Sequence, residues 1–253
     1  MTVALFAPCY VDQLYPGVAV ASLRLLEALG VDVAVPAGAV CCGQPMANAG
    51  FGSVGGAAAD AFEATFAPFE TVVTPSGSCA AHLQAHVGGA GRRTVELCRF
   101  LHDAVGVGAV AALGARWDAR VGVHVGCHAL RNLDLATPTE RGPGADGPTG
   151  TLRASVVHAL LGTVAGLEVV DLDRPDECCG FGGTFAVAEP AVSVKMGRDR
   201  LADHLGAGAE AVVSTDVSCA MHMEGIARRA GRSLPFLHPT QVLIKGVAAP
   251  VPA

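Results

Sequence analysis

The feature of this 253-residue sequence that most constrains its fold is a set of cysteines that occurs twice in the same order. Each set has one cysteine after a short apolar run, then an adjacent pair followed by glycine, then one cysteine after another apolar run. The first set is Cys9, Cys41, Cys42 and Cys79, and the second is Cys127, Cys178, Cys179 and Cys219. An internal repeat of this kind predicts two structural units of one type.

The spacing of the cysteines supports a duplication with one insertion. The distance from the pair to the last cysteine is 37 residues in the first set and 40 in the second. The distance from the first cysteine to the pair is 32 and 51 residues, and the longer interval contains DLATPTERGPGADGPTG, a Pro/Gly-rich stretch at 134–150. Such a composition is typical of a loop. We therefore expect a first repeat at 1–115, a second at 116–253 and a loop insertion at 134–150.

Short apolar segments alternate with helical patterns in both repeats. Strands are expected at 2–8, 31–36, 71–75, 119–125, 167–172 and 209–215, and helices at 16–30, 54–69, 151–164, 190–206 and after Cys219. This alternation predicts an α/β fold with two pseudo-symmetric repeats, each a small, mostly parallel sheet flanked by helices. Binding groups gather at the carboxyl ends of parallel strands, so the cysteines are expected there, with one site per repeat.

Composition and charge exclude several classes of function. The formal net charge of −6 argues against a nucleic-acid-binding surface, which needs clustered Lys and Arg. The sequence has no secretory signal pattern and no apolar run long enough for a membrane span, so we expect a cytoplasmic protein. Thiols in a reducing compartment serve metal or redox chemistry more often than structural disulfides.

The adjacent cysteines favour a centre with more than one metal atom. Neighbouring side chains on an extended chain point in opposite directions, so the pair needs an irregular loop, which the following glycine permits. A structural zinc ion usually takes cysteines two to four residues apart, whereas a cluster can accept adjacent thiolates on different irons. Four cysteines per repeat also match the ligand count of an iron–sulfur cluster. Zinc, in one or both repeats, and thiol–disulfide chemistry stay open as alternatives.

The motifs around the cysteines resemble those of a known family. The repeated pattern is similar to the CCG cysteine-rich domain found in heterodisulfide reductase and in the iron–sulfur subunits of glycolate oxidase and anaerobic glycerol-3-phosphate dehydrogenase. Over most of its length the chain resembles the lactate utilization protein A family, in the motifs LFAPCYVDQLYPGV, CCGQPMANAG, VVTPSGSCAAH, GCHALR and ECCGFGGTFAV.

This resemblance implies an iron–sulfur electron-transfer subunit of a multi-subunit system that converts L-lactate to pyruvate, with [4Fe-4S] clusters held by the eight cysteines. It implies two partners, a ferredoxin-like iron–sulfur subunit and a third small subunit, with L-lactate as the substrate of the system. The alternatives are a heterodisulfide-reductase-like thiol/disulfide redox subunit and a zinc-binding scaffold subunit.

Three histidines near the cysteines are additional candidate ligands, namely His82, His128 and His222. The CCG domains of heterodisulfide reductase carry a further cysteine where this chain has His82 and His222, and histidine ligates some iron–sulfur centres. The alternative is that both lie on the helix after the cysteine and only form local hydrogen bonds. We expect Cys98, which has no counterpart in the repeat, to be a buried thiol. His124 and His238 are expected to be hydrogen-bonded polar groups at strand ends.

Overall fold

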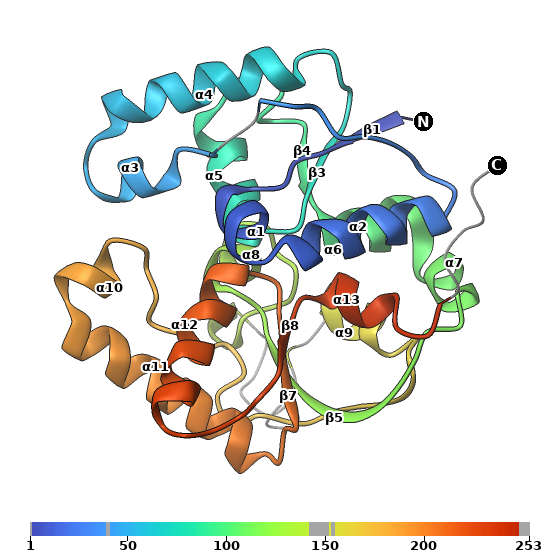
Figure 1. Ribbon diagram of the computed structural model, residues 1–253, viewed down its shortest axis with the longest axis vertical. Coiled ribbons are helices and arrows are strands. Elements are labelled where there is room, and N and C mark those ends of the chain that lie inside the picture. The colour runs from blue at the N-terminus through green and yellow to red at the C-terminus, as the bar shows by residue number, and fades with distance from the viewer. Residues whose placement is uncertain (1, 39–40, 142–151, 153–154, 248–253) are drawn as a thin grey trace.

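The protein folds into two parallel β-sheets, one from each cysteine repeat (Figure 1). The computed structural model describes residues 2–38, 41–141, 152 and 155–247. The first sheet contains β1 (Thr2–Leu5), β2 (Asp32–Ala34), β3 (Val72–Thr74) and β4 (Thr94–Glu96) in the order β2-β1-β3-β4. The second contains β5 (Arg116–His124), β6 (Ala165–Val169), β7 (Ala211–Ser214) and β8 (Phe236–Leu237) in the order β6-β5-β7-β8. Every strand pairing among these residues is parallel, so the predicted α/β fold with two repeats is confirmed.

Helices connect and cover the strands. The first repeat and the segment after it carry α1 (Cys9–Leu14), α2 (Pro16–Ala28), α3 (Gln44–Asn48), α4 (Gly52–Phe66), α5 (Gly77–His86), α6 (Leu97–Phe100), the π-helix η1 (Leu101–Gly106) and α7 (Val107–Ala112). The second carries α8 (Cys127–Arg131), the 3₁₀ turn η2 (Thr139–Arg141), α9 (Val156–Leu161), α10 (Phe185–Ala188), α11 (Pro190–Gly206), α12 (Val217–Arg229) and α13 (Pro239–Leu243). Of the predicted insertion at 134–150, residues 142–150 lie outside the described part of the chain.

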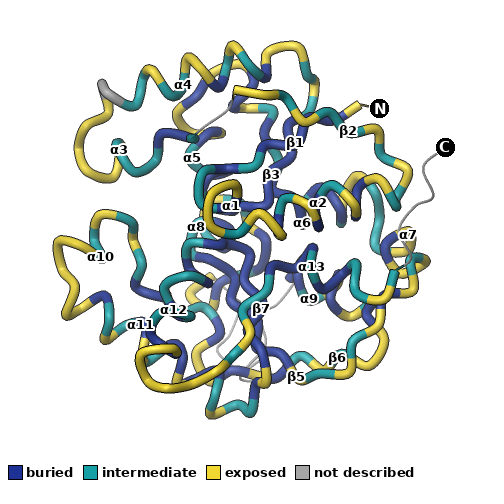
Figure 2. The backbone as a smooth tube through the Cα atoms, viewed as in Figure 1, coloured by how far each residue is buried: buried dark blue, intermediate teal, exposed yellow. Residues whose placement is uncertain are grey.

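The sequence pattern located the central strands but not the last strand of each sheet. The residues of β3 and β7 are completely buried (Figure 2), and such strands appear in the sequence as continuous apolar runs. The last strands, β4 and β8, are only three and two residues long. Segments this short carry too little periodicity to be identified.

The two repeats pack against each other through matching helices. The helix after the fourth strand of each sheet lies against the helix after the first strand of the other, so that α13 contacts α2 and α6 contacts α9. The helices that follow the cysteines pair in the same reciprocal way, α5 with α8 and α12 with α1. At Gly77 the approach is so close that a Cβ would lie 2.6 Å from the Cβ of Ala129. This reciprocal packing brings the carboxyl ends of both sheets together.

Candidate metal centre

The four single cysteines lie just beyond the two central strands of each sheet. Cys9 and Cys127 begin α1 and α8, directly after β1 and β5. Cys79 and Cys219 are the third residues of α5 and α12, which follow β3 and β7. Strand order reverses between these central strands, and ligands of open α/β sheets bind at such a point.

The adjacent pairs lie on tight loops shaped by glycine. Gly43 and Gly180 adopt φ angles of 92° and 85°, which an L-residue with a side chain rarely adopts. The backbone N–H of each glycine donates to a thiol sulfur, from Gly43 to Cys41 and from Gly180 to Cys178, at 3.4 Å in both loops. The glycine after each pair therefore both turns the chain and provides a hydrogen bond to sulfur.

Within each repeat the four thiols form one continuous group. The Sγ atoms of Cys9 and Cys41 are 4.0 Å apart, and hydrogen bonds connect Cys41 to Cys42 and Cys42 to Cys79. The second set has the same order of contacts, from Cys127 through Cys178 and Cys179 to Cys219. All nine cysteines of the chain are free thiols.

The crowding of these thiols strongly shifts their protonation. Hydrogen bonds from Cys42 and Cys9 lower the pKa of Cys41. Donating these bonds, together with burial, raises the pKa of Cys9 and of Cys42. In the second set, hydrogen bonds from Cys127 and Cys179 lower the pKa of Cys178 in the same way. Each group can therefore hold one thiolate among protonated neighbours, and full deprotonation requires a nearby positive charge. This donor set fits a metal ion or metal cluster.

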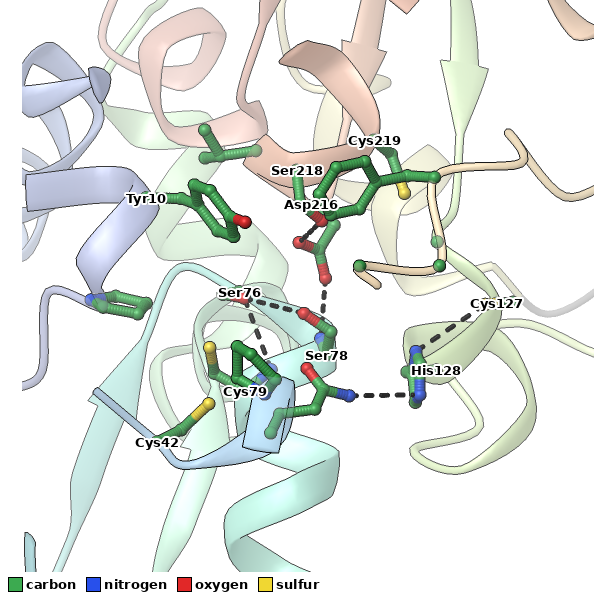
Figure 3. Close-up of a pocket in the computed structure, with 18 of the residues that line it drawn as sticks. Tyr10, Cys42, Ser76, Ser78, Cys79, Cys127, His128, Asp216, Ser218 and Cys219 are labelled. Atoms are coloured by element: carbon green, nitrogen blue, oxygen red, sulfur yellow. Dashed lines mark hydrogen bonds between the residues drawn. The ribbon is translucent and has the colours of Figure 1, made fainter. Parts of the chain in front are cut away.

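Both groups face a single cavity between the repeats (Figure 3). The cavity has a volume of about 100 Å³ and is lined by cysteines of both sets. Asp216 of the second repeat binds the first repeat, since its carboxylate accepts a hydrogen bond from the backbone N–H of Ser78 at 2.7 Å. The same carboxylate accepts from the hydroxyl of Ser218, in its own repeat, at 2.9 Å. Gln44 likewise reaches His128, with 3.2 Å between their Nε2 atoms. The two groups thus open onto one space and not onto two separate surfaces.

The three candidate histidines have different surroundings. His82 and His222 lie on α5 and α12, as expected for residues on the helix after a cysteine. The Nε2 of His222 lies within hydrogen-bond distance, 3.2 Å, of the backbone carbonyl oxygen of Ser193. Burial lowers the pKa of His82. His128 lines the cavity, with its Nδ1 3.6 Å from the Sγ of Cys127.

His124 is the residue that sequence reasoning missed. Its ligand atom, together with those of Cys179 and Cys219, forms a group in which all lie within 4.8 Å of one another. The side chain is buried and neither ring nitrogen has a hydrogen-bond partner among the described residues, so the expectation of a hydrogen-bonded group is wrong. Burial and the nearby charge of Arg200 lower its pKa to about 3, which keeps the imidazole neutral. His238, by contrast, caps α13 through a hydrogen bond from Thr240 N–H to its Nδ1.

Cys98 is a buried thiol, as predicted from its place outside the repeat. It has no exposed surface, and burial followed by the charge of Glu96 raises its pKa. Glu96 itself is 1% exposed and caps α6 by accepting from the backbone N–H of Arg99 at 3.0 Å. These two residues lie at the end of β4 and belong to the packing of the repeats.

The buried carboxyl of Glu96 should make stability depend on pH. Burial raises its pKa from an ordinary value near 4.5 to about 7, so the folded chain binds the extra proton between these values. The protonated Glu96 carboxyl therefore contributes its full share of stability below about pH 4.5, and this share is lost as the pH rises through 7. The unfolding free energy of wild type should therefore fall by about 3 kcal/mol more than that of Glu96→Gln when the pH is raised from 4 to 8. Urea unfolding under reductant measures this difference, and a difference independent of pH would contradict the raised pKa.

The chain matches a family and several relatives over most of its length. The model of the CCG cysteine-rich domain matches residues 3–84 and 121–224. The chain is 36% identical to lactate utilization protein A of Exiguobacterium sp. (strain ATCC BAA-1283 / AT1b), an alignment that covers 97% of this chain and 98% of the relative. It is 34% identical to lactate utilization protein A of Macrococcus caseolyticus, with 98% of each chain covered.

A solved structure has a related fold. The crystal structure of a hypothetical protein from Helicobacter pylori superposes with a TM-score of 0.54 and 12% identity, covering 99% of this chain. The chain spans about half of that protein, 49% of its length. Among the described residues, no helix is both long and apolar enough to cross a membrane.

Proposed function

Since the chain belongs to the CCG cysteine-rich domain family that includes lactate utilization protein A, we propose that it is the iron–sulfur electron-transfer subunit of a multi-subunit lactate utilization system. The observation that carries this proposal is the pair of equivalent four-thiol groups that open onto one cavity. Two redox centres that share one cavity would suit electron relay better than two isolated structural sites.

The local chemistry supports a cluster in preference to a single zinc ion. Each group contains an adjacent cysteine pair, which fits metal atoms at more than one position better than one tetrahedral ion. Iron–sulfur clusters, when bound, supply one-electron transfer, with potentials tuned by hydrogen bonds to sulfur. The backbone N–H groups of Gly43 and Gly180 donate such bonds, and these stabilise negative charge on the sulfur atoms of Cys41 and Cys178.

The role in lactate utilization follows from the names of the relatives. Conversion of L-lactate to pyruvate releases two electrons and two protons, which the assembled system must pass to an acceptor. The chain carries no flavin or nicotinamide fingerprint in its sequence, so we assign it the relay of electrons. We propose a ferredoxin-like iron–sulfur subunit and a third small subunit as its partners.

The test is metal analysis of the chain purified without oxygen, followed by reduction in the presence of both partner subunits and L-lactate. We expect iron and acid-labile sulfide in matching amounts, on the order of four to eight irons per chain. Lactate should then reduce the centres, as seen by electron paramagnetic resonance, only when the partners are present. Zinc without sulfide would overturn the cluster. Iron and sulfide that lactate never reduces in the complete system would overturn the lactate role.

A further inference from the structure

The two repeats differ sharply in what lies behind their cysteines. In the first, Phe6 of the segment after β1 packs against Phe62 and Phe66 of α4, with ring centroids 5.1 and 5.6 Å away. All three side chains are essentially inaccessible to solvent. They form an entirely apolar support beneath the first group of thiols.

In the second repeat the side chains in this region are polar. His124 precedes Cys127 by three residues, just as Phe6 precedes Cys9. Its ring faces His204 of α11, with centroids 6.4 Å apart in an edge-to-face arrangement like that of Phe6 and Phe66.

Arg200 completes the polar set. It lies four residues before His204, the same interval that separates Phe62 from Phe66. In the second repeat, α11 thus presents an imidazole and a guanidinium group to the end of β5, where α4 presents aromatic rings to the end of β1 in the first.

Most of the nitrogen atoms in this polar set lack the hydrogen bonds that normally accompany burial. Both ring nitrogens of His124 and of His204, and two nitrogens of Arg200, have no partner among the described residues. Each unpaired buried polar group costs about 1–3 kcal/mol. The three phenylalanines behind the first group of thiols incur no such cost. The polar residues therefore need a function that phenylalanine cannot perform.

The geometry points to that function. We propose that His124 is a nitrogen ligand of the metal centre in the second repeat, beside Cys179 and Cys219, so that the two repeats hold chemically different centres. The ligand atoms of these three residues lie within 4.8 Å of one another. Donors bound to one metal at about 2.0–2.3 Å are necessarily that close. The inference rests on the proposed function in one respect, that the second repeat binds a metal centre.

His204 packs against His124, and Arg200 lies close enough to affect its protonation. The strand residue facing His204 is Gly122, where a Cβ would lie 2.2 Å from the Nδ1 of His204. A larger residue at Gly122 would displace His204 from the ring of His124. The guanidinium of Arg200 adds positive charge near the centre, whereas Phe62 adds none. An imidazole ligand gives a cluster a higher reduction potential than a thiolate in the same place, so a cysteine at position 124 should lower the potential of the second centre.

The matched variants come from the first repeat. His124→Phe introduces the residue found at Phe6, and His204→Phe makes the same change in the ring that packs against His124 without removing the ligand. The chain is labelled with ¹⁵N-histidine and purified without oxygen, and its nitrogen hyperfine couplings are recorded by pulsed electron paramagnetic resonance. We expect one histidine coupling in wild type, its loss in His124→Phe, and its retention in His204→Phe.

His124→Cys keeps a ligand at this position and guards against misfolding of the phenylalanine variant. It should retain the metal content of wild type, lose the histidine coupling, and shift the potential of the second centre downward. A coupling that persists in both His124 variants, or a wild type loaded with an iron–sulfur cluster but without any histidine coupling, would overturn the assignment. Wild type without bound metal would overturn the proposed function as well. If wild type holds zinc, X-ray absorption at the zinc edge decides between the two hypotheses. A nitrogen ligand that His124→Cys removes would support the assignment of His124 and overturn only the proposed iron–sulfur function.

Discussion

Replacing Cys179 with serine should remove the metal centre of the second repeat and leave that of the first. Cys179 is 2% exposed and lies between Cys178 and Cys219 in the chain of thiol contacts. A serine hydroxyl stays protonated at neutral pH and is a poor ligand for iron. With two centres of equal iron content per chain, iron and sulfide should fall by about half. Metal analysis and electron paramagnetic resonance of the oxygen-free chain measure the loss.

Two control variants make this result specific. Cys42→Ser is the equivalent change in the first repeat and should remove the other set of signals. Cys98→Ala deletes a buried thiol outside both groups and should leave iron and sulfide unchanged. Unchanged metal and spectra in Cys179→Ser would show that the second group of thiols does not hold the centre. Loss of all metal in either serine variant would indicate one shared centre in place of two.

Asp203→Ala should destabilise the fold by about 3–5 kcal/mol, because it leaves a buried arginine without its counter-charge. Arg200 is completely buried, and its Nη1 lies 2.7 Å from a carboxylate oxygen of Asp203. The same carboxylate accepts from the backbone N–H groups of Asp173 at 3.0 Å and Arg174 at 3.2 Å. One substitution therefore removes three hydrogen bonds and an ion-pair partner from the interior.

Urea unfolding of the oxygen-free chain measures this change, with Asp118→Ala as the control. Asp118 pairs with Arg116 at 2.8 Å, but its side chain is 69% exposed. Exposed pairs of this kind contribute about 0–1 kcal/mol, so the control should shift the unfolding free energy by no more than that. Equal effects of the two substitutions would show that the Arg200 charge is not confined to the interior.

The sequence predicted the parts of the fold that follow from local pattern. The helices at 16–30, 54–69 and 190–206 carry long periodic patterns, and they are observed as α2, α4 and α11 within a few residues of the expected ends. The predicted strands appear in the two sheets for the same reason. The fourth strands were missed, because β4 and β8 are too short to leave a signal.

His124 shows where local reasoning fails. A histidine at the end of an apolar strand usually forms hydrogen bonds, and nothing in its own segment indicates otherwise. The available signal was the alignment of the two repeats, in which Phe6 stands opposite His124. Its significance still depended on α11, which brings Arg200 and His204 to it from far along the chain.

The sequence by itself determined that the protein consists of two similar α/β repeats and that each carries four cysteines at the carboxyl ends of its strands. Apolar periodicity, glycine after each cysteine pair and the order of the motifs are local properties that do not depend on how the repeats dock. Only the tertiary structure decided that both groups of thiols face one cavity and that polar residues support only the second. The shared cavity depends on the reciprocal packing of α5 with α8 and α12 with α1, and the polar support depends on the placement of α11 against β5; no single segment encodes either.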